Sequence, residues 1–213
     1  MRVLDLFCGA GGAAMGLHRA WPKAEIVGVD IVNQKNYPFQ FRIADAMHYP
    51  LGGFDFIWAS PPCQAYSIMR NLPWLRHKEY PRLIDQTRER LVASGAAWVI
   101  ENVMGAKLPA GWLCGGMFGL PFFRHRAFES NFFWLAPPHP RHANTVRNGR
   151  TLGARARDIV HNGAKKLAAN YGHAAGVQLA REAMEIPWMK REELTQAIPP
   201  AYSEFIARQW RPK

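Results

Sequence analysis

Two side chains stand where they could do chemistry. Cys63 follows two prolines in SPPCQAYS, directly after the apolar run FDFIWA, which predicts a strand. Proline fixes φ and removes an amide donor, so the thiol is carried on a stiff turn. A thiolate held in this way can act as a covalent nucleophile when its pKa is lowered or its attack is assisted. Taken alone, a single cysteine is more often a small buried hydrophobe.

The second side chain, Glu101, shifts that balance toward chemistry. It closes the apolar run AAWVI, where partial desolvation would raise its pKa and let it carry a proton at neutral pH. The competing interpretation is a surface carboxylate at a strand end. The carboxyl ends of parallel strands share one edge of a sheet, and ligands bind along that edge. We therefore expect Cys63 and Glu101 to lie close together.

A glycine-rich turn predicts a nucleotide-like cofactor. In DLFCGAGGAAMG, the residues Gly9, Gly11 and Ala14 have the G-x-G-x-x-A spacing between a predicted strand and a helix. Glycines permit the tight turn and let a ligand approach the backbone. Asp30 closes the next predicted strand and could accept hydrogen bonds from ribose hydroxyls, and Asp45 holds the matching place one strand later. A nicotinamide dinucleotide and S-adenosylmethionine both remain open, because a helix N-terminus can bind a pyrophosphate or a carboxylate.

The elements that must position these groups alternate between strand and helix over the first hundred residues. This alternation predicts an α/β, Rossmann-like fold with a parallel-rich sheet. One helix is expected from about Ala13, and another over residues 79–94, ending near Gly95. Residues 113–133 suggest two short strands around a turn. The C-terminal segments VQLAREAMEI and REELTQAIPPAYSEFIARQW predict helices divided by prolines.

Charge indicates a polyanionic partner. The chain has 27 Lys and Arg against 16 Asp and Glu, a net charge of +11. A merely soluble basic surface is the alternative. Between His139 and Asn170 a single acid, Asp158, faces seven basic residues in a stretch poor in large aliphatics, which predicts a basic loop or small lobe that contacts phosphates. The seven are Arg141, Arg147, Arg150, Arg155, Arg157, Lys165 and Lys166.

Other features limit the setting of the protein. No apolar stretch is long enough to span a bilayer, and no signal peptide follows Met1, so a cytoplasmic location is expected. The three cysteines would remain thiols in a reducing compartment. A metal site is not expected, because no histidine shows ligand-like spacing with a cysteine; the histidines considered are His125, His139, His142, His161 and His173.

Four segments in this order, DLFCGAGG, SPPCQAYS, VIENV and RHRAFES, resemble the DNA (cytosine-5) methyltransferase family, especially its short phage and bacterial members. The resemblance covers most of residues 1–130 and resumes near residues 176–211. It implies S-adenosylmethionine as cofactor and double-stranded DNA as partner, with the target cytosine flipped out of the helix. An obligate protein partner is not evident.

The resemblance also implies roles for individual residues. Cys63 would attack C6 of cytosine, and Glu101 would protonate or hydrogen-bond N3 and the exocyclic amine. Arg126 would contact the pyrimidine O2, and Arg124 a neighbouring group or a phosphate. Gln196 stands where the family usually has asparagine. The residues matching the cofactor side are Phe7, Gly9, Gly11, Asp30, Ile31, Asp45, Pro61 and Gln196, with Ile31 against adenine, Asp30 on the ribose and Asp45 on the adenine amine.

Nucleic-acid contacts are expected from two parts of the chain. Residues 66–76 could close over the flipped base, although an ordinary surface loop is nearly as consistent with the sequence. The predicted nucleic-acid-binding residues are Gln64, Ser67, Arg70, Arg147, Arg155, Arg157, Lys165 and Lys166.

We predict three parts in the chain. Residues 1–130 form the catalytic and cofactor-binding domain, residues 131–176 a very small target-recognition region, and residues 177–213 C-terminal helices that return to the first domain. Three alternatives stay open: the same chemistry on RNA, a catalytically silent nucleic-acid-binding protein on this fold, and a nicotinamide oxidoreductase. Hydride transfer would not need the pair of Cys63 and Glu101, which speaks against the last.

Overall fold

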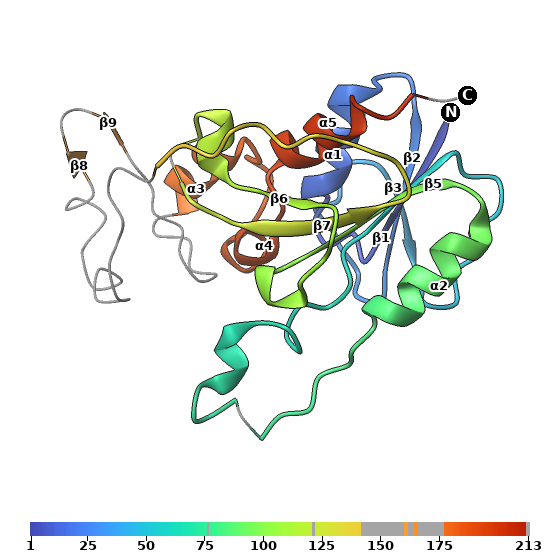
Figure 1. The fold of residues 1–213 in the computed structure, drawn as a ribbon, viewed down its shortest axis with the longest axis horizontal. Coiled ribbons are helices and arrows are strands. Elements are labelled where there is room, and N and C mark those ends of the chain that lie inside the picture. The colour runs from blue at the N-terminus through green and yellow to red at the C-terminus, as the bar shows by residue number, and fades with distance from the viewer. Residues whose placement is uncertain (76, 121, 142–159, 162–163, 166–176, 212–213) are drawn as a thin grey trace.

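A seven-stranded, mostly parallel sheet forms the centre of the molecule (Figure 1). The computed structural model describes residues 1–75, 77–120, 122–141, 160–161, 164–165 and 177–211. The strand order is β3-β2-β1-β4-β5-β7-β6, in which β7 runs antiparallel to both of its neighbours. This confirms the predicted parallel-rich α/β fold. The strands are β1 (Arg2–Leu6), β2 (Glu25–Asp30), β3 (Gln40–Ile43), β4 (Phe56–Ala59), β5 (Ala97–Asn102), β6 (Gly111–Leu113) and β7 (Arg126–Ser130).

Helices cover both faces of the sheet, because alternate strand residues are apolar on both sides. Val3, Trp58 and Val99 pack in one cluster with α1 and α5. Their neighbours Leu4 and Ile57 pack in a second cluster with α2. Figure 1 shows α1 and α5 on one side of the sheet and α2 on the other. The helices are α1 (Gly12–Ala20), α2 (Ile84–Ser94), α3 (Val177–Met184), α4 (Arg191–Gln196) and α5 (Pro200–Ala207).

The helix α5 packs against α1, close to the N-terminal turn. At Gly16 a Cβ atom would lie 2.1 Å from both the Pro200 carbonyl oxygen and the Ser203 Oγ, so glycine lets α1 and α5 approach closely. The Ser203 hydroxyl donates to the Ala13 carbonyl at 2.8 Å. This contact joins α5 to the start of α1, beside the glycine-rich turn.

Two predicted elements differ from the structure. The helix expected over residues 79–94 begins at Ile84, with Leu83 as its N-cap. Pro81 disfavours helical geometry at Tyr80, which excludes the first residues of the expected range. It ends as expected at Gly95, whose φ is 71°. In residues 113–133, the strand β7 does form, but β6 begins before this segment and a 3-10 turn, Gly115–Phe118, follows it. Within the described residues, no helix has the length and apolar character needed to cross a membrane.

Candidate active site

The turns that follow β4 and β5 are tied together at the carboxyl edge of the sheet. The two strands are parallel neighbours, with Ala59 paired to Ile100. The Asn102 side chain donates to the Pro61 carbonyl at 2.9 Å, which links the turn carrying Cys63 to the end of β5. The Cys63 carbonyl in turn accepts from the backbone N–H groups of Tyr66 and Ser67 at 3.0 and 2.9 Å. The backbone of Cys63 is thus held on both sides.

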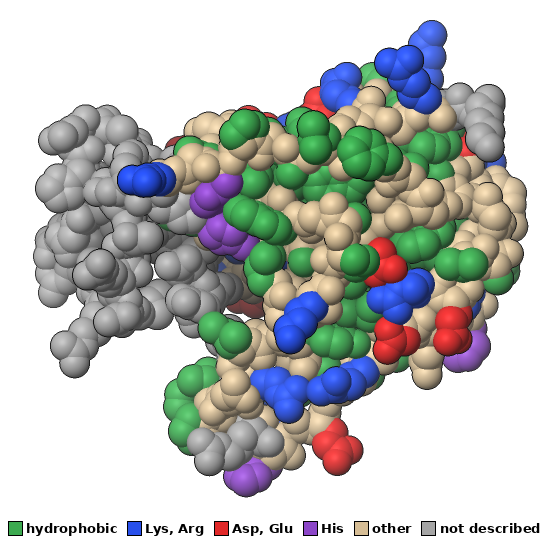
Figure 2. All heavy atoms as spheres, viewed as in Figure 1, with side chains coloured by type: hydrophobic (Ala, Val, Ile, Leu, Met, Phe, Trp, Pro, Cys, Tyr) green, Lys and Arg blue, Asp and Glu red, His purple; other side chains and the backbone are tan. Residues whose placement is uncertain are grey.

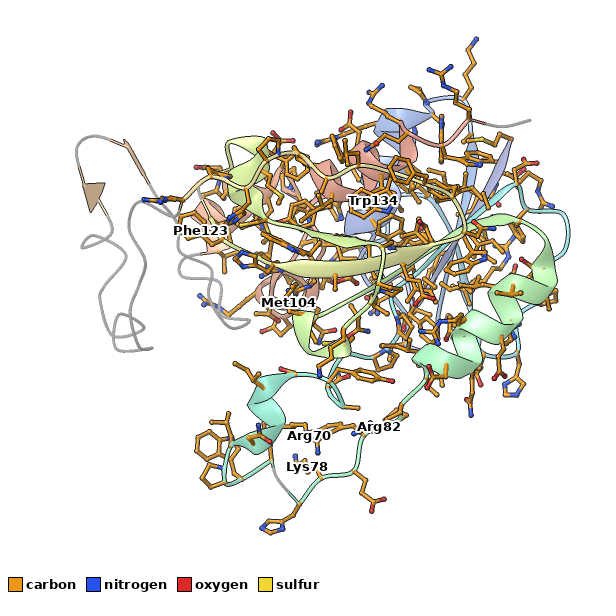
Figure 3. The ribbon with its side chains drawn as sticks, viewed as in Figure 1. Arg70, Lys78, Arg82, Met104, Phe123 and Trp134 are labelled. Carbon is orange, nitrogen blue, oxygen red and sulfur yellow. The ribbon has the colours of Figure 1, made fainter. Side chains whose placement is uncertain are left out.

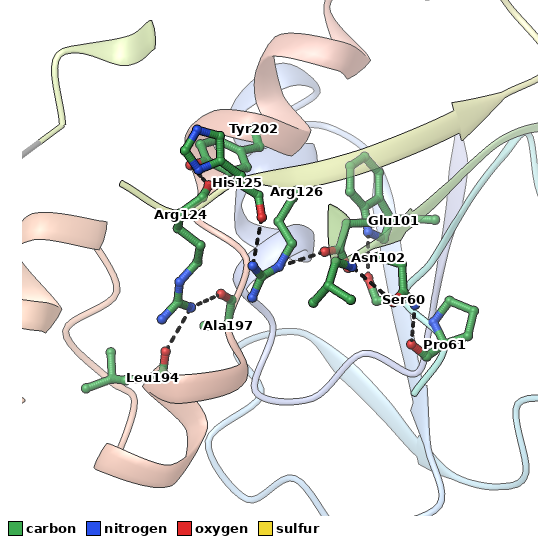
Figure 4. A network of polar contacts seen from close by, with 12 residues as sticks. Ser60, Pro61, Glu101, Asn102, Arg124, His125, Arg126, Leu194, Ala197 and Tyr202 are labelled. Atoms are coloured by element: carbon green, nitrogen blue, oxygen red, sulfur yellow. Dashed lines mark hydrogen bonds and ion pairs between the residues drawn. The ribbon is translucent and has the colours of Figure 1, made fainter. Parts of the chain in front are cut away.

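Glu101 lies inside this edge and is only 5% exposed. Burial raises the pKa of its carboxyl group, in the direction expected from the sequence, while Arg126 and the Ser60 hydroxyl oppose the rise. Arg126 Nε lies 3.0 Å from Glu101 Oε1, and Figure 4 shows this pair. The arrangement gives a carboxyl group that can hold a proton closer to neutral pH than a surface glutamate does.

Cys63 is half-buried and lies near enough to Glu101 and Arg126 to respond to their charges. Burial is the main cause that raises the pKa of its thiol, and the Glu101 carboxylate raises it further; Arg126 and Arg124 lower it. In the free protein the thiol therefore stays protonated at neutral pH. A nucleophilic Cys63 requires that a bound substrate or a neutral Glu101 remove part of this penalty.

Arg124 is buried, with 4% of its surface exposed, and its guanidinium faces the protein interior. Its Nη1 donates to the carbonyls of Leu194, at 3.1 Å, and Ala197, at the end of α4 (Figure 4). The Tyr202 hydroxyl donates to the Arg124 carbonyl at 2.6 Å. Burial lowers the pKa of Arg124 to about 9. A guanidinium buried in this way is poorly placed for a phosphate, and its Nη1 fastens the C-terminal helices; the predicted contact of Arg124 with a neighbouring group stays a prediction.

The glycine-rich turn has a backbone that few side chains permit. Phe7, Gly9 and Gly11 have φ values of 55°, 48° and 83°. A Cβ at Gly9 would meet nothing within 4 Å, so open space lies beside the turn. The Asp30 carboxylate accepts from the backbone N–H groups of Gly9 at 3.0 Å and Val32 at 2.9 Å. Open space and a carboxylate at the strand end fit an adenosine-containing cofactor.

The other predicted cofactor residues are distributed around this turn and along the same edge. Ile31, directly after β2, is 72% exposed, which leaves its apolar surface available to a flat ring. Asp45 is exposed; it accepts a hydrogen bond from the Met47 backbone N–H at 2.8 Å and pairs with His48 at 2.7 Å. The hydrogen bond from Met47 is the main cause that lowers the pKa of Asp45. Pro61 is buried and offers its carbonyl to Asn102.

Gln196 belongs to a C-terminal segment that contacts the glycine-rich turn and the start of α1. It is exposed at the end of α4. At Gly12 a Cβ would lie 2.3 Å from the Ile198 carbonyl, so this segment touches the start of α1. The Trp188 indole donates to the Ala10 carbonyl at 2.8 Å. The C-terminal segment thus closes one side of the glycine-rich turn.

Some of the predicted nucleic-acid-binding residues lie in the part of the chain that the structure describes, and others lie outside it. Gln64 and Arg70 are exposed and Ser67 is half-buried, all close after Cys63. Figure 3 shows Arg70, Lys78 and Arg82 on the segment that projects from the sheet. Arg70 and Arg82 help to line a hollow of about 260 Å³ beside Tyr66. The backbone of Lys165 lies in β9 (Ala164–Lys165), paired with β8 (Val160–His161), whereas Arg147, Arg155, Arg157 and Lys166 lie outside the described residues.

Two features were not found from the sequence. One is the role of Asn102, which a polar residue at the end of a buried strand could have signalled. The other is a cluster in which Cys114, His125 and His139 place their ligand atoms within 4.8 Å of one another. The sequence spacing of these residues gave no sign of the cluster, because strand pairing brings Cys114 and His125 together and a later segment adds His139.

The sheet order, the glycine-rich turn and the acidic strand ends define the fold of an S-adenosylmethionine-dependent methyltransferase. Residues 1–107 match the family model described as C-5 cytosine-specific DNA methylase, and the chain belongs to that family. It accordingly transfers a methyl group from S-adenosylmethionine to cytosine. A comparison with curated proteins found no match.

Solved structures agree with this fold. The S. pombe Dnmt2 methyltransferase is similar with a TM-score of 0.59 and 15% sequence identity, over 97% of this chain and 97% of that chain. The Entamoeba histolytica methyltransferase EhMeth is similar with a TM-score of 0.56 and 11% identity, over 97% of this chain and 96% of that chain. At such low identity these likenesses describe the fold alone.

Proposed function

We propose that this protein methylates C5 of cytosine in double-stranded DNA through a covalent bond between Cys63 Sγ and C6 of a flipped-out base. The observation that carries the proposal is the joining of Cys63 and Glu101 at neighbouring strand ends by the hydrogen bond from Asn102 to Pro61, with Glu101 buried against Arg126. A nucleophile and a proton-holding carboxyl at one edge suit addition to a pyrimidine ring.

Addition would proceed as follows. The Cys63 thiolate forms a bond to C6, and the electron pair of the C5–C6 double bond is drawn toward N3, where Glu101 supplies a proton or a hydrogen bond. Arg126 orients Glu101 and offers a donor to the pyrimidine O2. These steps make C5 nucleophilic. After methylation, loss of the C5 proton to a base re-forms the C5–C6 double bond and breaks the bond from sulfur to C6, which frees Cys63. The proton that N3 received returns to Glu101.

The cofactor side would be formed by residues already described. When bound, S-adenosylmethionine supplies a methyl group made electrophilic by its sulfonium. The turn at Phe7, Gly9 and Gly11 would let the cofactor approach the backbone closely, because Gly9 carries no side chain into the open space beside it. Asp30 would accept from the ribose hydroxyls, Ile31 would pack on adenine, and Asp45 would accept from the adenine amine. Gln196 would close the site from the C-terminal side.

A nucleic acid, rather than a free nucleotide, is favoured as the substrate by charge and by the position of exposed basic residues, and the matching family model, which is one of DNA methylases, favours DNA. The net charge of +11 suits a polyanion and argues against a free nucleotide. Arg70 is exposed and Arg82 lies with it on the segment after Cys63, where both could bind phosphates beside a flipped base. Flipping costs a few kcal/mol, which such phosphate contacts help to offset.

A labelling assay tests the proposal. Radiolabelled S-adenosylmethionine is incubated separately with duplex DNA, structured RNA and dCMP. We expect the wild-type protein to label DNA alone and the Cys63→Ser variant to label no substrate. Calorimetry should show that this variant still binds the cofactor. Label in RNA alone would show that RNA, and not DNA, is the substrate. Label that survives Cys63→Ser would overturn the covalent mechanism.

A second substrate isolates the covalent step. DNA with fluorine at cytosine C5 cannot lose a C5 proton, so the bond between sulfur and C6 should persist after methylation. We expect a protein–DNA complex that resists denaturant and is absent with Cys63→Ser. If wild-type protein methylates ordinary DNA but forms no such complex, the adduct is ruled out.

The predicted basic region has its own test. Replacing Arg155 and Arg157 by alanine removes two cations from the stretch expected to contact phosphates. Each lost phosphate contact should reduce the slope of log K against log salt by about 0.9. We expect weaker DNA binding with a shallower salt slope, measured by fluorescence anisotropy. The same slope in variant and wild type would contradict a phosphate contact at these positions.

A further inference from the structure

A cluster of metal-ligating side chains lies where β6 ends and β7 begins, next to Arg126 at the edge that carries the candidate active site. Within the described residues, Cys114, His125 and His139 each bring a ligand atom within 4.8 Å of the other two. We propose that these three side chains bind a zinc ion that fastens residues 131–141 to the end of β6 and β7. Nothing in the methyl-transfer chemistry uses these groups, so the proposal goes beyond the proposed function.

Strand pairing brings the first two ligands together. In the antiparallel register of β6 and β7, Trp112 faces Ala127 and Leu113 faces Arg126. The next step of this register places Cys114 beside His125. Cys114 is fully buried and His125 is half-buried, so the two ligands start from one rigid edge of the sheet.

The third ligand comes from the segment that runs alongside β6. At Gly111 a Cβ would come within 3.1 Å of the Trp134 ring, and at Gly116 within 3.4 Å of Pro140 Cγ. These close approaches hold residues 131–141 against β6 and its following turn. His139 is therefore delivered to the cluster by packing on both sides of it.

The histidine rings share one aromatic neighbour. The Trp112 ring centroid lies 5.3 Å from that of His125 and 4.8 Å from that of His139, and the two imidazole centroids are 5.4 Å apart. Figure 2 shows histidine side chains on the face turned toward the viewer. An indole that contacts both imidazoles limits their rotation, which lowers the entropy lost when they bind an ion.

A backbone N–H group donates to the Cys114 side chain. The donor is the N–H of Met117, in the cap of the 3-10 turn. Amide hydrogen bonds to sulfur are the kind of outer contact that supports a metal thiolate, and a bound metal removes the thiol proton outright.

The ligand chemistry favours zinc. One thiolate and two imidazoles suit a borderline-soft ion, and three protein ligands leave one tetrahedral position for water. Ligand atoms around tetrahedral zinc lie about 3.4–3.7 Å apart, so binding requires a small inward shift. His139 is exposed and can make that shift. Zinc would then fix the segment that leads into the basic region.

Cobalt is the probe for this site. Purified full-length protein is treated with a chelator under a non-thiol reductant and titrated with Co²⁺, whose tetrahedral thiolate complexes have intense visible bands and a sulfur-to-cobalt charge-transfer band. We expect one equivalent to bind and one equivalent of Zn²⁺ to displace it. His139→Ala should lower Co²⁺ affinity by about 100-fold, and Cys114→Ser should abolish the charge-transfer band.

Two matched variants act as controls. His77→Ala removes another exposed histidine, and Cys63→Ser removes a thiol outside the cluster; both should keep the wild-type cobalt spectrum. Because Cys114 is buried, its variant could fail to fold, whereas His139 is exposed and its variant should retain the wild-type circular dichroism spectrum. The proposal is overturned if wild-type protein gives no tetrahedral cobalt spectrum, or if the spectrum and affinity are unchanged in His139→Ala.

Discussion

The five parallel strands and the β7–β6 edge build the same active edge in opposite ways. In the parallel part, each polar group stands at the last residues of its strand, as Asp30 does in β2 and Glu101 after the apolar part of β5. Strand β7 runs in the opposite direction, so its first residue, Arg126, comes to the edge where the others end. The reversal therefore lets a strand start contribute to a site made of strand ends.

The two arginines that flank His125 also act at different places in the molecule. Arg126 faces Glu101 at 3.0 Å, whereas Arg124, two residues earlier, donates to carbonyls at the end of α4. One arginine thus acts on the candidate site and the other on the C-terminal helices. Substitutions at these positions should separate chemistry from stability.

The largest expected effect is that of Glu101→Gln. Glutamine keeps the shape but cannot donate the proton, so kcat should fall by about 100- to 1000-fold with little change in cofactor affinity. Glu129→Gln is the matched control, because Glu129 lies on β7, the strand next to β5, and pairs with Arg88 of α2 at 2.6 Å. Its kcat should fall by less than a few-fold. Single-turnover methylation rates measure both. An equal fall in kcat for the two variants would show that Glu101 has no special role compared with Glu129.

The next effect is that of Arg126→Met. We expect kcat to fall by about 10- to 100-fold, because the buried carboxyl loses the group that orients it. Arg126 lowers the pKa of Glu101, so its removal should raise that pKa further. The limb of the pH–rate profile that reports a protonated Glu101 should move to higher pH. A limb that stays in place would show that another group sets it.

A smaller and different effect is expected from Arg124→Ala. It leaves a cavity and removes the donor to two carbonyls of the α4 end, which should cost about 2–4 kcal/mol of the free energy of unfolding. Urea denaturation measures this loss. Below the unfolding transition, kcat should change less than in Arg126→Met. A larger fall in kcat without loss of stability would assign Arg124 to chemistry after all.

The smallest effect concerns the pH dependence of stability. The pKa of Glu101 is raised in the folded state, so the folded protein binds a proton that the unfolded chain has lost. The stability of the wild type should therefore be fully present below the ordinary glutamate pKa and decrease as pH rises through the raised value. Glu101→Gln lacks this decrease, so its melting temperature relative to wild type should increase as pH rises from the ordinary glutamate pKa through the raised one. A constant difference would contradict the burial of a titrating carboxyl.

Much of the parallel part was predictable, because local patterns report it. Apolar runs ending in Asp30 or Glu101 indicate strands with polar ends, and Gly9 and Gly11 indicate a turn that needs positive φ. The start of α2 was less predictable, since Leu83 fits the helical spacing yet lies outside the helix. The antiparallel edge was harder still, because β6 and β7 are short and their pairing is not local.

By itself, the sequence determined the parallel sheet, the cofactor turn and the candidate nucleophile with its carboxyl partner, because each depends on a short run of neighbouring residues. Only the tertiary structure decided that Arg124 serves α4, that Asn102 ties Pro61 to β5, and that Cys114 lies beside His125 and His139. The physical reason is the same in each case. These contacts join residues that are distant along the chain, and their geometry exists only after the strands pair and the C-terminal helices pack.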